Sequence, residues 1–359
     1  MTFASQNPPV PVTLLTGFLG SGKTTLLNRC LREAQMADTL VIINEFGQTA
    51  LDHMLVAHSQ ENIIQEMGSG CLCCTIRRDL VQTLRDITWR FSRQGRRQFS
   101  RVLIETTGLA DPAPIIHTLL SEPQLAGRYS LDGLATVVDL EHGLATLEQY
   151  AEARRQVAVA DLLLLSKRDL VSPAREQAVR ERLRELNPLA QRHVLSAREA
   201  VAPWLLGLGG QLGQWRAWRE QAFMIEDHDV DHDHDHDHDH DHDHDHDHGP
   251  DVNRHGEAIR SLSMVLPGEL PAARLEDWLA SFCEWAGERL LRLKGVLALR
   301  GHGQPQVVHA VQHRAYPLQE LPQWPWPARE GRLVLITRNL DPDDVWVWLR
   351  ELDEAVRPA

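Results

Sequence analysis

The segment Val12-Thr-Leu-Leu-Thr16-Gly17-Phe-Leu-Gly20-Ser-Gly22-Lys23-Thr24-Thr25 decides the fold of this chain. It contains the pattern G-x-x-x-x-G-K-T, placed after a predicted strand and before a predicted helix. Glycines permit a loop whose backbone N–H groups converge on phosphate oxygens, and the helix N-terminus adds partial positive charge. The pattern predicts a P-loop in which Lys23 reaches the β- and γ-phosphates and the Thr24 hydroxyl binds Mg²⁺. The residues expected to hold the nucleotide phosphates are Gly17, Gly20, Ser21, Gly22, Lys23, Thr24 and Thr25.

Short apolar runs alternate with longer helical patterns over the first 220 residues. Strands are predicted at Val12–Thr16, Thr39–Asn44, Arg101–Glu105, Gly133–Asp139 and Asp161–Ser166, with a weaker one at His193–Ser196. Helices are predicted at Lys23–Glu33, Ile76–Arg90 and Pro173–Leu186. Continuous Val, Ile and Leu runs bounded by helices are typical of a mostly parallel sheet covered on both faces. We therefore expect an α/β P-loop NTPase domain over residues 1–220, in which Asp139 is interpreted as a cap at its strand end.

A second pattern occupies residues 258–359 and predicts a small α+β domain. Its strands are predicted at Ser261–Leu266, Gly295–Arg300, Gln306–Gln312 and Arg332–Arg338, and its helices at Pro271–Leu291 and Pro342–Val356. Asp341 before Pro342 favours a helix start, because Asp is a preferred N-cap and Pro suits the first helical position. We expect Trp278 and Trp285 in the core. Ordinary surface roles are expected for His302, His309 and His313.

An Asp/His tract separates the two patterns. Eleven aspartates and ten histidines lie between Asp227 and His248, with no lysine or arginine among them. The tract explains most of the net charge of −13, because the rest of the chain holds 39 acids against 37 bases, so no surface for nucleic acid is indicated. The lack of apolar residues from Asp231 to Gly249 predicts a disordered linker over residues 221–257. Its imidazoles favour weak, unselective metal binding, and a low-complexity expansion with incidental affinity is the alternative.

Two later segments bear on the choice of nucleotide. The strand that ends in Glu105 is expected to place a Walker-B acid beside the Mg²⁺ site, in contact directly or through water. Ser166-Lys167-Arg168-Asp169 resembles the guanine-binding N/T-K-x-D motif, in which the carboxylate of Asp169 accepts two hydrogen bonds that adenine does not offer. Lys167 is expected to lay its alkyl stem along the base. The Leu195-Ser196-Ala197 backbone is expected to contact guanine O6, so GTP is favoured over ATP.

Three of the five cysteines, Cys71, Cys73 and Cys74, lie within four positions directly before a predicted helix. Thiols at a helix N-terminus have a lowered pKa, and thiolate is the form that binds soft or borderline metals. Three sulfurs fall short of the four ligands of a closed structural zinc site. The spacing therefore predicts an incomplete site from which a metal is released again, with a cluster of small buried hydrophobic residues as the alternative.

The other two cysteines, Cys30 and Cys283, stand alone, so the pattern is not a disulfide framework. A reducing, cytoplasmic location is expected. No run approaches the roughly 18 to 20 apolar residues of a membrane span, and the start of the sequence lacks the basic and apolar regions of a secretory signal. We therefore expect neither a membrane nor a nucleic-acid partner.

Taken in order, these motifs carry a family resemblance. Gly17–Thr25, Asn44-Glu45-Phe46-Gly47, Gly70-Cys71-Leu-Cys73-Cys74, Glu105–Pro112 and Ser166–Asp169 occur in the order seen in CobW-type GTPases. Arg292-Leu-Lys294-Gly295 resembles a segment of that family's C-terminal domain. The chain is similar to these P-loop metallochaperones over nearly its whole length. The resemblance implies slow, Mg²⁺-dependent GTP hydrolysis linked to delivery of zinc or cobalt to a client protein. We expect that client to dock mainly on the C-terminal domain.

By the same resemblance, the thiolates of Cys71, Cys73 and Cys74 bind the cargo metal, and Glu45 is a candidate carboxylate nearby. A helix-capping or solvated acid is the alternative for Glu45. Gln48 follows the Asn44–Gly47 motif, where the resemblance leads us to expect an acid. We expect a GTP-dependent metallochaperone; a metal-storage protein that acts through the Asp/His tract and a nickel-enzyme accessory GTPase are the alternatives. No motif assigns the water-activating group or the oligomeric state.

Overall fold

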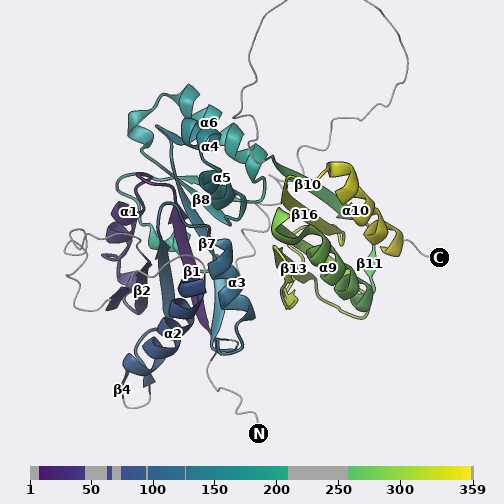
Figure 1. Cartoon of the computed structure of the whole chain (residues 1–359), viewed down its shortest axis with the longest axis horizontal. Coiled ribbons are helices and arrows are strands. Elements are labelled where there is room, and N and C mark those ends of the chain that lie inside the picture. Colours follow the sequence, from purple (N-terminus) through teal and green to yellow (C-terminus); the bar gives the residue numbers. More distant parts are fainter. Residues whose placement is uncertain are drawn as a thin grey trace, which may run out of the picture.

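The computed structural model describes residues 8–44, 63–66, 74–93, 96–125, 127–208 and 258–356. Figure 1 shows two bodies, an N-terminal one in which helices flank a sheet and a C-terminal one with a sheet of its own. The predicted linker over residues 221–257 lies outside the described residues. Among the helices that the structure describes, none combines the length and the apolar character needed to cross a bilayer.

The N-terminal domain is built on a parallel sheet whose described strands follow the order β3-β2-β6-β1-β7-β8-β9. The strands are β1 (Val10–Gly17), β2 (Thr39–Asn44), β3 (Ile63–Glu66), β6 (Arg101–Thr106), β7 (Tyr129–Asp139), β8 (Leu162–Ser166) and β9 (Gln191–Val194). Successive residues of β1 belong to different core clusters, Leu14 to one and Leu15 to the other. The sheet is thus buried on both faces, as the continuous apolar runs predict. β3 was not among the predicted strands, and β9 begins at Gln191, before the expected start.

Helices cover both faces of this sheet. They are α1 (Lys23–Cys30), α2 (Cys74–Arg90), α3 (Ala113–Ser121), α4 (Gly143–Gln149), α5 (Ala151–Ala158), α6 (Pro173–Leu186) and α7 (Ala202–Leu205), with 3-10 turns η1 (Ala34–Met36) and η3 (Arg168–Leu170) and a small hairpin of β4 (Ser92–Arg93) and β5 (Arg96–Arg97). The prediction for α1 is wrong in its last turn: the helix ends at Cys30. Glu33 adopts an extended backbone instead, and its carboxylate accepts the N–H groups of Val201 and Ala202 at 2.7 and 3.0 Å.

The C-terminal domain is an antiparallel sheet with helices packed on it, which confirms the expected α+β class. Its main strands, in sheet order, are β10 (Ile259–Leu266), β16 (Gly331–Arg338), β12 (Leu290–Leu299), β13 (Gln306–Val311) and β14 (Arg314–Ala315). The short strands β11 (Glu269–Leu270) and β15 (Gln319–Glu320) pair with β12 and β13, and the helical elements are α9 (Ala272–Ala286), η4 (Gly287–Arg289) and α10 (Pro342–Val356). α10 begins as predicted: Oδ1 of Asp341 accepts the N–H of Asp343 at 3.0 Å.

The helix predicted to run to Leu291 is wrong in its last five residues. α9 ends at Ala286 because Gly287 takes a positive φ of 57°, a conformation that favours glycine and ends a helix. The chain then enters β12 at Leu290. Trp278 lies in the core as predicted, and its indole N–H donates to the carbonyl of Trp348 at 2.8 Å.

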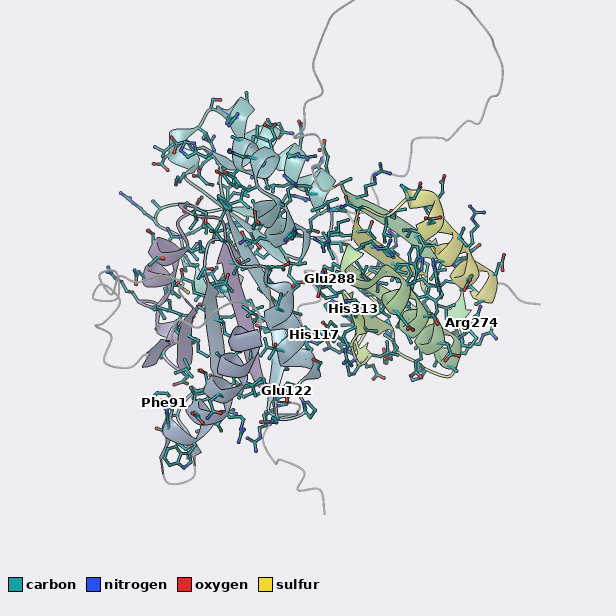
Figure 2. All side chains as sticks on the ribbon, in the orientation of Figure 1. Phe91, His117, Glu122, Arg274, Glu288 and His313 are labelled. Atoms are coloured by element: carbon teal, nitrogen blue, oxygen red, sulfur yellow. The ribbon has the colours of Figure 1, made fainter. Side chains whose placement is uncertain are left out.

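The two domains meet where α3, α5 and α6 pack against β13, β12 and β10, respectively. Figure 2 shows side chains filling this boundary, with His117 on α3 and Glu288 and His313 on the C-terminal side. The arrangement brings segments more than 70 residues apart into contact, so the C-terminal domain rests directly on helices of the nucleotide-binding fold.

A buried charge cluster lies at this boundary. The carboxylate of Asp161, directly before β8, pairs with Arg292 and with Lys294 of β12, the latter at 3.0 Å. Burial by itself opposes ionisation, but the two cations hold the pKa of Asp161 well below its usual range. His309, opposite Lys294 on β13, has its Nε2 atom buried in the same interface, so the expected surface role is wrong. The physical reason is that β13 is covered by the first domain, which local sequence does not indicate.

Candidate functional site

The loop between β1 and α1 has the backbone that its glycines predict. Gly17 has φ 143°, and a Cβ added there would lie 2.4 Å from the carbonyl oxygen of Val137 on the adjacent strand. Gly22 has φ 95° at the position before α1. Both conformations disfavour residues with a side chain, so these glycines shape the loop and direct it into the helix. This geometry fits a phosphate-binding loop.

Lys23, at the start of α1, is folded back over the loop. Its Nζ donates to the carbonyl oxygens of Gly17 at 2.6 Å and Phe18 at 3.1 Å, and only 8% of the residue is exposed. Burial lowers the pKa of Lys23, and the charge of Glu105 partly opposes that effect. The ammonium is therefore held inside the predicted phosphate site, close to the carboxylate of Glu105 on β6.

Thr24 and Glu105 come together although they are 81 positions apart. The Thr24 hydroxyl is exposed and donates to Oε1 of Glu105 at 3.1 Å. Glu105 is buried near the end of β6, beside Leu15 of β1 in register. A hydroxyl and a carboxylate are hard oxygen donors of the kind that Mg²⁺ uses, so these two residues fit the expected ion.

The end of β8 lies against the same loop. The Ser166 hydroxyl donates to the carbonyl of Ser21 at 2.7 Å. Lys167 has φ 58°, and its Nζ donates to Oδ2 of Asp139 at 2.6 Å. Asp139 also accepts backbone N–H groups of the following turn, so the interpretation of it as only a cap is incomplete. Asp169 is exposed in η3, two residues after Lys167.

Ser196 and Ala197, the residues expected to contact guanine O6, lie exposed after β9. Their carbonyl oxygens accept hydrogen bonds from the guanidinium of Arg29 on α1, at 2.9 and 3.4 Å. The bonds join the helix that follows the P-loop to the loop after β9. Arg29 belongs to no motif, so sequence reasoning missed it.

The predicted thiol site falls largely outside the described residues: this holds for Glu45, Cys71 and Cys73. Cys74 is the first residue of α2, as expected for a thiol at a helix start. Glu45 directly follows β2, whose Ile43 is in register with Glu105 of β6 on one side and Glu66 of β3 on the other.

The two isolated cysteines have a different environment. Cys30 and Cys283 are buried free thiols, and burial raises the pKa of each to about 12. A thiol that is almost entirely protonated near neutral pH is a poor metal ligand. These two residues therefore serve the cores of their domains.

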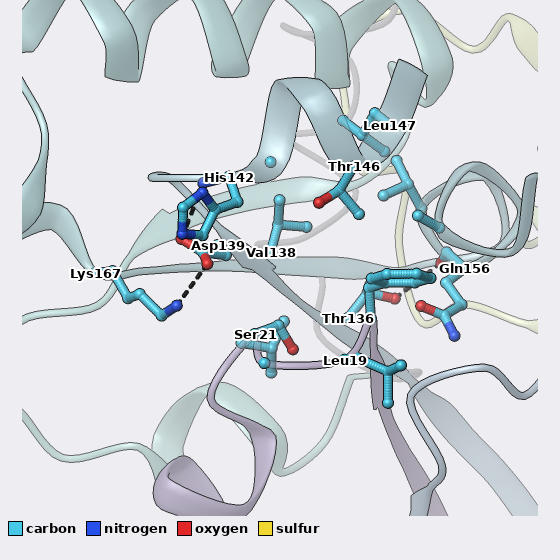
Figure 3. A pocket seen from close by; sticks show the side chains of 16 residues that line it. Leu19, Ser21, Thr136, Val138, Asp139, His142, Thr146, Leu147, Gln156 and Lys167 are labelled. Atoms are coloured by element: carbon cyan, nitrogen blue, oxygen red, sulfur yellow. Dashed lines mark hydrogen bonds and ion pairs between the residues drawn. The ribbon is translucent and has the colours of Figure 1, made fainter. Parts of the chain in front are cut away.

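A pocket with about 490 Å³ of space, partly open to solvent, adjoins the P-loop between β7, α4 and α5 (Figure 3). Its walls include Leu19, Ser21, Thr136, Asp139, Gln156 and Lys167. Gln156 is fully buried, and sequence reasoning missed it. The sequence feature that could have pointed to Gln156 is its position directly before the apolar run Val157-Ala-Val-Ala160.

Comparisons with known proteins place these features in context. Residues 11–194 match the family described as CobW/HypB/UreG, nucleotide-binding domain, and residues 259–352 match the cobalamin synthesis protein cobW C-terminal domain. Over 182 residues the chain is 41% identical to the zinc chaperone YjiA of Escherichia coli, covering 51% of this chain and 56% of that protein. Over 212 residues it is 32% identical to the zinc-regulated GTPase metalloprotein activator 1 of Saccharomyces cerevisiae, covering 53% of this chain and 48% of that protein.

The alignments thus span about half the length of these curated relatives. The structural similarity extends over more of the chain than these sequence alignments do. The crystal structure of Zn(II)-bound YjiA GTPase from E. coli matches with a TM-score of 0.64 and 25% identity, covering 96% of this chain and 99% of that one.

Proposed function

The chain belongs to the CobW/HypB/UreG family, and from this premise we propose that it hydrolyses GTP and delivers zinc to a client protein. The family match confirms the resemblance that the sequence motifs indicate. It also confirms the predicted P-loop α/β fold and the assignment to the CobW/YjiA group of GTPases. The observation that carries the functional proposal is the strand order. It aligns Glu105 of β6 with Ile43 of β2, so the Mg²⁺-binding side of the P-loop adjoins the strand that leads into Glu45.

Hydrolysis uses the residues around the P-loop. Lys23 binds the β- and γ-phosphate oxygens, because its ammonium already lies over the loop. Thr24 and Glu105 hold Mg²⁺, directly or through water, and Gly17, Gly20, Ser21, Gly22 and Thr25 complete the phosphate site. When bound, Mg²⁺ would supply positive charge that offsets the negative charge of the phosphates.

Selection of guanine uses the ends of β8 and β9. Asp169 accepts hydrogen bonds from guanine N1–H and the 2-amino group, which adenine lacks. Lys167 lies along the base, and the Ser196-Ala197 backbone contacts O6. The hydrogen bonds from Arg29 to that backbone support this assignment, because they fix the loop relative to the P-loop helix.

The cargo site consists of Cys71, Cys73 and Cys74 with Glu45 nearby. Zinc is favoured over cobalt because the relatives include a zinc chaperone and a zinc-regulated activator. Loss of the γ-phosphate relaxes the segments that follow β2 and β3, and the metal then passes to a client metalloprotein docked mainly on the C-terminal domain. A cytoplasmic setting, which keeps the thiols reduced, belongs to the same proposal.

Calorimetric metal competition tests the proposal. Zinc affinity is measured with GDP and with a nonhydrolysable GTP analogue, for wild type, Cys73→Ala and Cys283→Ala. We expect the tight site to respond to the nucleotide in wild type and in Cys283→Ala, whose buried thiol is the matched control, and to be lost in Cys73→Ala. Equal zinc affinity in the two nucleotide states would exclude the coupling.

Deleting residues 227–248 separates delivery from storage. A chaperone keeps its GTPase activity and one tight site after the deletion, whereas a storage protein loses most of its bound metal. Nickel rather than zinc at the thiol site would instead support a nickel-enzyme accessory GTPase.

A further inference from the structure

Gln156 of α5 joins that helix to the loop that follows Glu105. Its side-chain N–H₂ donates to the carbonyl oxygens of Gly108 at 3.1 Å and Ala110 at 3.0 Å, and the residue is fully buried. Figure 3 shows Gln156 on the wall of the pocket beside Leu19 of the P-loop. One amide therefore holds two carbonyls of a single turn, and a buried carbonyl that loses such a donor is costly to leave unbonded.

The loop held by Gln156 lies directly on the P-loop. A Cβ added to Gly108 would lie 2.6 Å from Cδ2 and 2.8 Å from the backbone nitrogen of Leu19. Ala110 closes a turn by donating its N–H to the carbonyl of Thr107 at 3.1 Å. Because the two loops are in contact and Glu105 begins this segment, a shift near the γ-phosphate has to move the carbonyls that Gln156 binds.

The turn of α5 that carries Gln156 is also held by the C-terminal domain. The carbonyl of Val159, at the end of the helix, accepts a hydrogen bond from the guanidinium of Arg292. The same guanidinium pairs with Asp161, whose second oxygen accepts the N–H of Leu134 at 3.0 Å. Lys294 pairs with Asp161 as well. The residues just after α5 are thereby attached to β12.

Asn187 holds the same carboxyl end of α5. The amide of Asn187 donates to the carbonyls of Val157, Ala158 and Ala160 at 2.7, 3.1 and 2.9 Å, which satisfies the end of the helix. α5 packs against β1 on one side and β12 on the other, and Figure 1 shows it between the parallel sheet and the C-terminal domain.

We propose that the last turn of α5, from Gln156 to Val159, couples the loop beside the γ-phosphate to the C-terminal domain, with Gln156 and Arg292 as the positioning residues that attach this turn to each. The inference rests on the proposed function, since it names the route by which nucleotide state reaches the domain expected to bind the client. Coupling of this kind is reciprocal. A client that shifts the C-terminal domain therefore changes the preference for GTP over GDP by the same factor by which GTP changes client affinity.

The ratio of affinities for a nonhydrolysable GTP analogue and for GDP tests the contact between Gln156 and the loop after Glu105. Gln156→Met removes both donors at similar volume, and we expect it to lower the preference for the GTP analogue about tenfold. Arg154→Met is the matched control, because Arg154 is a buried residue of the same helix that also binds two carbonyls, those of Leu147 and Glu148. It is expected to leave the ratio within about twofold.

The contact with the C-terminal domain is tested by Arg292→Lys, which keeps a positive charge beside Asp161 but loses the forked contact with Val159. We expect the ratio to shift at least about threefold. Arg332→Lys, at an arginine paired with Glu330 in its own domain, is the control. Should Arg292→Lys fail to fold, Lys294→Gln perturbs the same attachment.

A double variant, Gln156→Met with Arg292→Lys, measures the coupling itself. If the two residues act through one helix, the double variant shifts the ratio by less than the product of the single shifts. The inference is overturned if the two single shifts multiply in the double variant, or if Gln156→Met loses affinity for both nucleotides equally. The proposed function still stands in either case if the wild-type protein hydrolyses GTP. A wild-type protein that binds neither nucleotide overturns both.

Discussion

The ammonium of Lys167 lies 2.6 Å from Oδ2 of Asp139, so the carboxyl ends of β8 and β7 are joined beside the P-loop. Asp139 is held in turn by the N–H groups of Glu141 and His142 at 2.7 and 3.4 Å. The lysine expected to lie along guanine is therefore not a freely rotating side chain: a fixed carboxylate sets the position of its end group.

Replacing Asp139 by Asn removes the charge but keeps the side-chain shape. We expect the KM for GTP to rise about five- to tenfold, with kcat changed less than about threefold, because the lost contact positions the base and not the γ-phosphate. Steady-state kinetics check this. Glu141→Gln, two residues away, is the control, and a kcat that falls as far as KM rises would contradict a role at the base.

Replacing Glu105 by Gln keeps the length of the side chain that meets Thr24 and removes its charge. GTP turnover is expected to fall about 100-fold, a size typical of lost electrostatic stabilisation in a transition state. GDP affinity should stay within about threefold, because most phosphate contacts come from the P-loop backbone. Turnover of Glu181→Gln, on the exposed face of α6, should match wild type. Undiminished turnover in Glu105→Gln would remove Glu105 from the proposed site.

Asp161→Asn leaves Arg292 and Lys294 buried without their counter-charge. Removing one partner of a buried ion pair lowers the free energy of unfolding by about 3–5 kcal/mol. Glu288→Gln is the control: it breaks the exposed pair of Glu288 and Arg338 and is expected to cost less than about 1 kcal/mol. Denaturant unfolding of both variants checks this, and equal losses would show that the domain boundary does not depend on the cluster.

The same carboxylate predicts an acid dependence. The pKa of Asp161 is lower in the folded protein than in the unfolded chain, where it lies near about 4. Its stabilisation is therefore complete above about pH 4 and is lost as the pH falls toward the folded value. Wild type should lose stability in this range more steeply than Asp161→Asn.

His309 predicts a second dependence at higher pH. Burial, with the charges of Lys294 and Arg292, holds the pKa of His309 well below its ordinary value. As the pH falls, His309 is protonated in the unfolded chain before it is protonated in the folded protein. The free energy of unfolding therefore falls below about pH 6.5, by at most about 1.4 kcal/mol per pH unit. Denaturant unfolding at pH 7.5 and 5.5 should show a smaller difference for His309→Gln than for wild type. His302→Gln, at an exposed histidine, should keep the wild-type difference.

Alkylation distinguishes the cysteines. Since burial raises the pKa of Cys30 and Cys283 to about 12, only about one in 10⁴ of each is thiolate at pH 8. Mass spectrometry after brief iodoacetamide treatment should find these two unmodified in the folded protein and Cys71, Cys73 and Cys74 modified unless zinc is present. Zinc that leaves the labelling of those three unchanged would contradict the cargo site.

Part of this molecule was predictable because it depends on near neighbours along the chain. The P-loop follows from glycines that permit positive φ before Lys23, and α10 follows from an aspartate cap before Pro342. Apolar runs such as Leu162–Leu165 predicted buried parallel strands. The prediction that a helix runs to Leu291 was wrong because a helical pattern and a strand pattern overlap in one apolar stretch.

What the sequence determined by itself, then, is the set of local parts: the phosphate loop, the order of its motifs, and the helices and strands that carry them. The tertiary structure alone decided which parts meet. Gln156 reaches Gly108 across 48 positions, and Arg292 reaches Asp161 across 131. Contacts of this range depend on how strands are ordered in a sheet and which helix faces are covered, and neither is encoded in the spacing of residues near either partner.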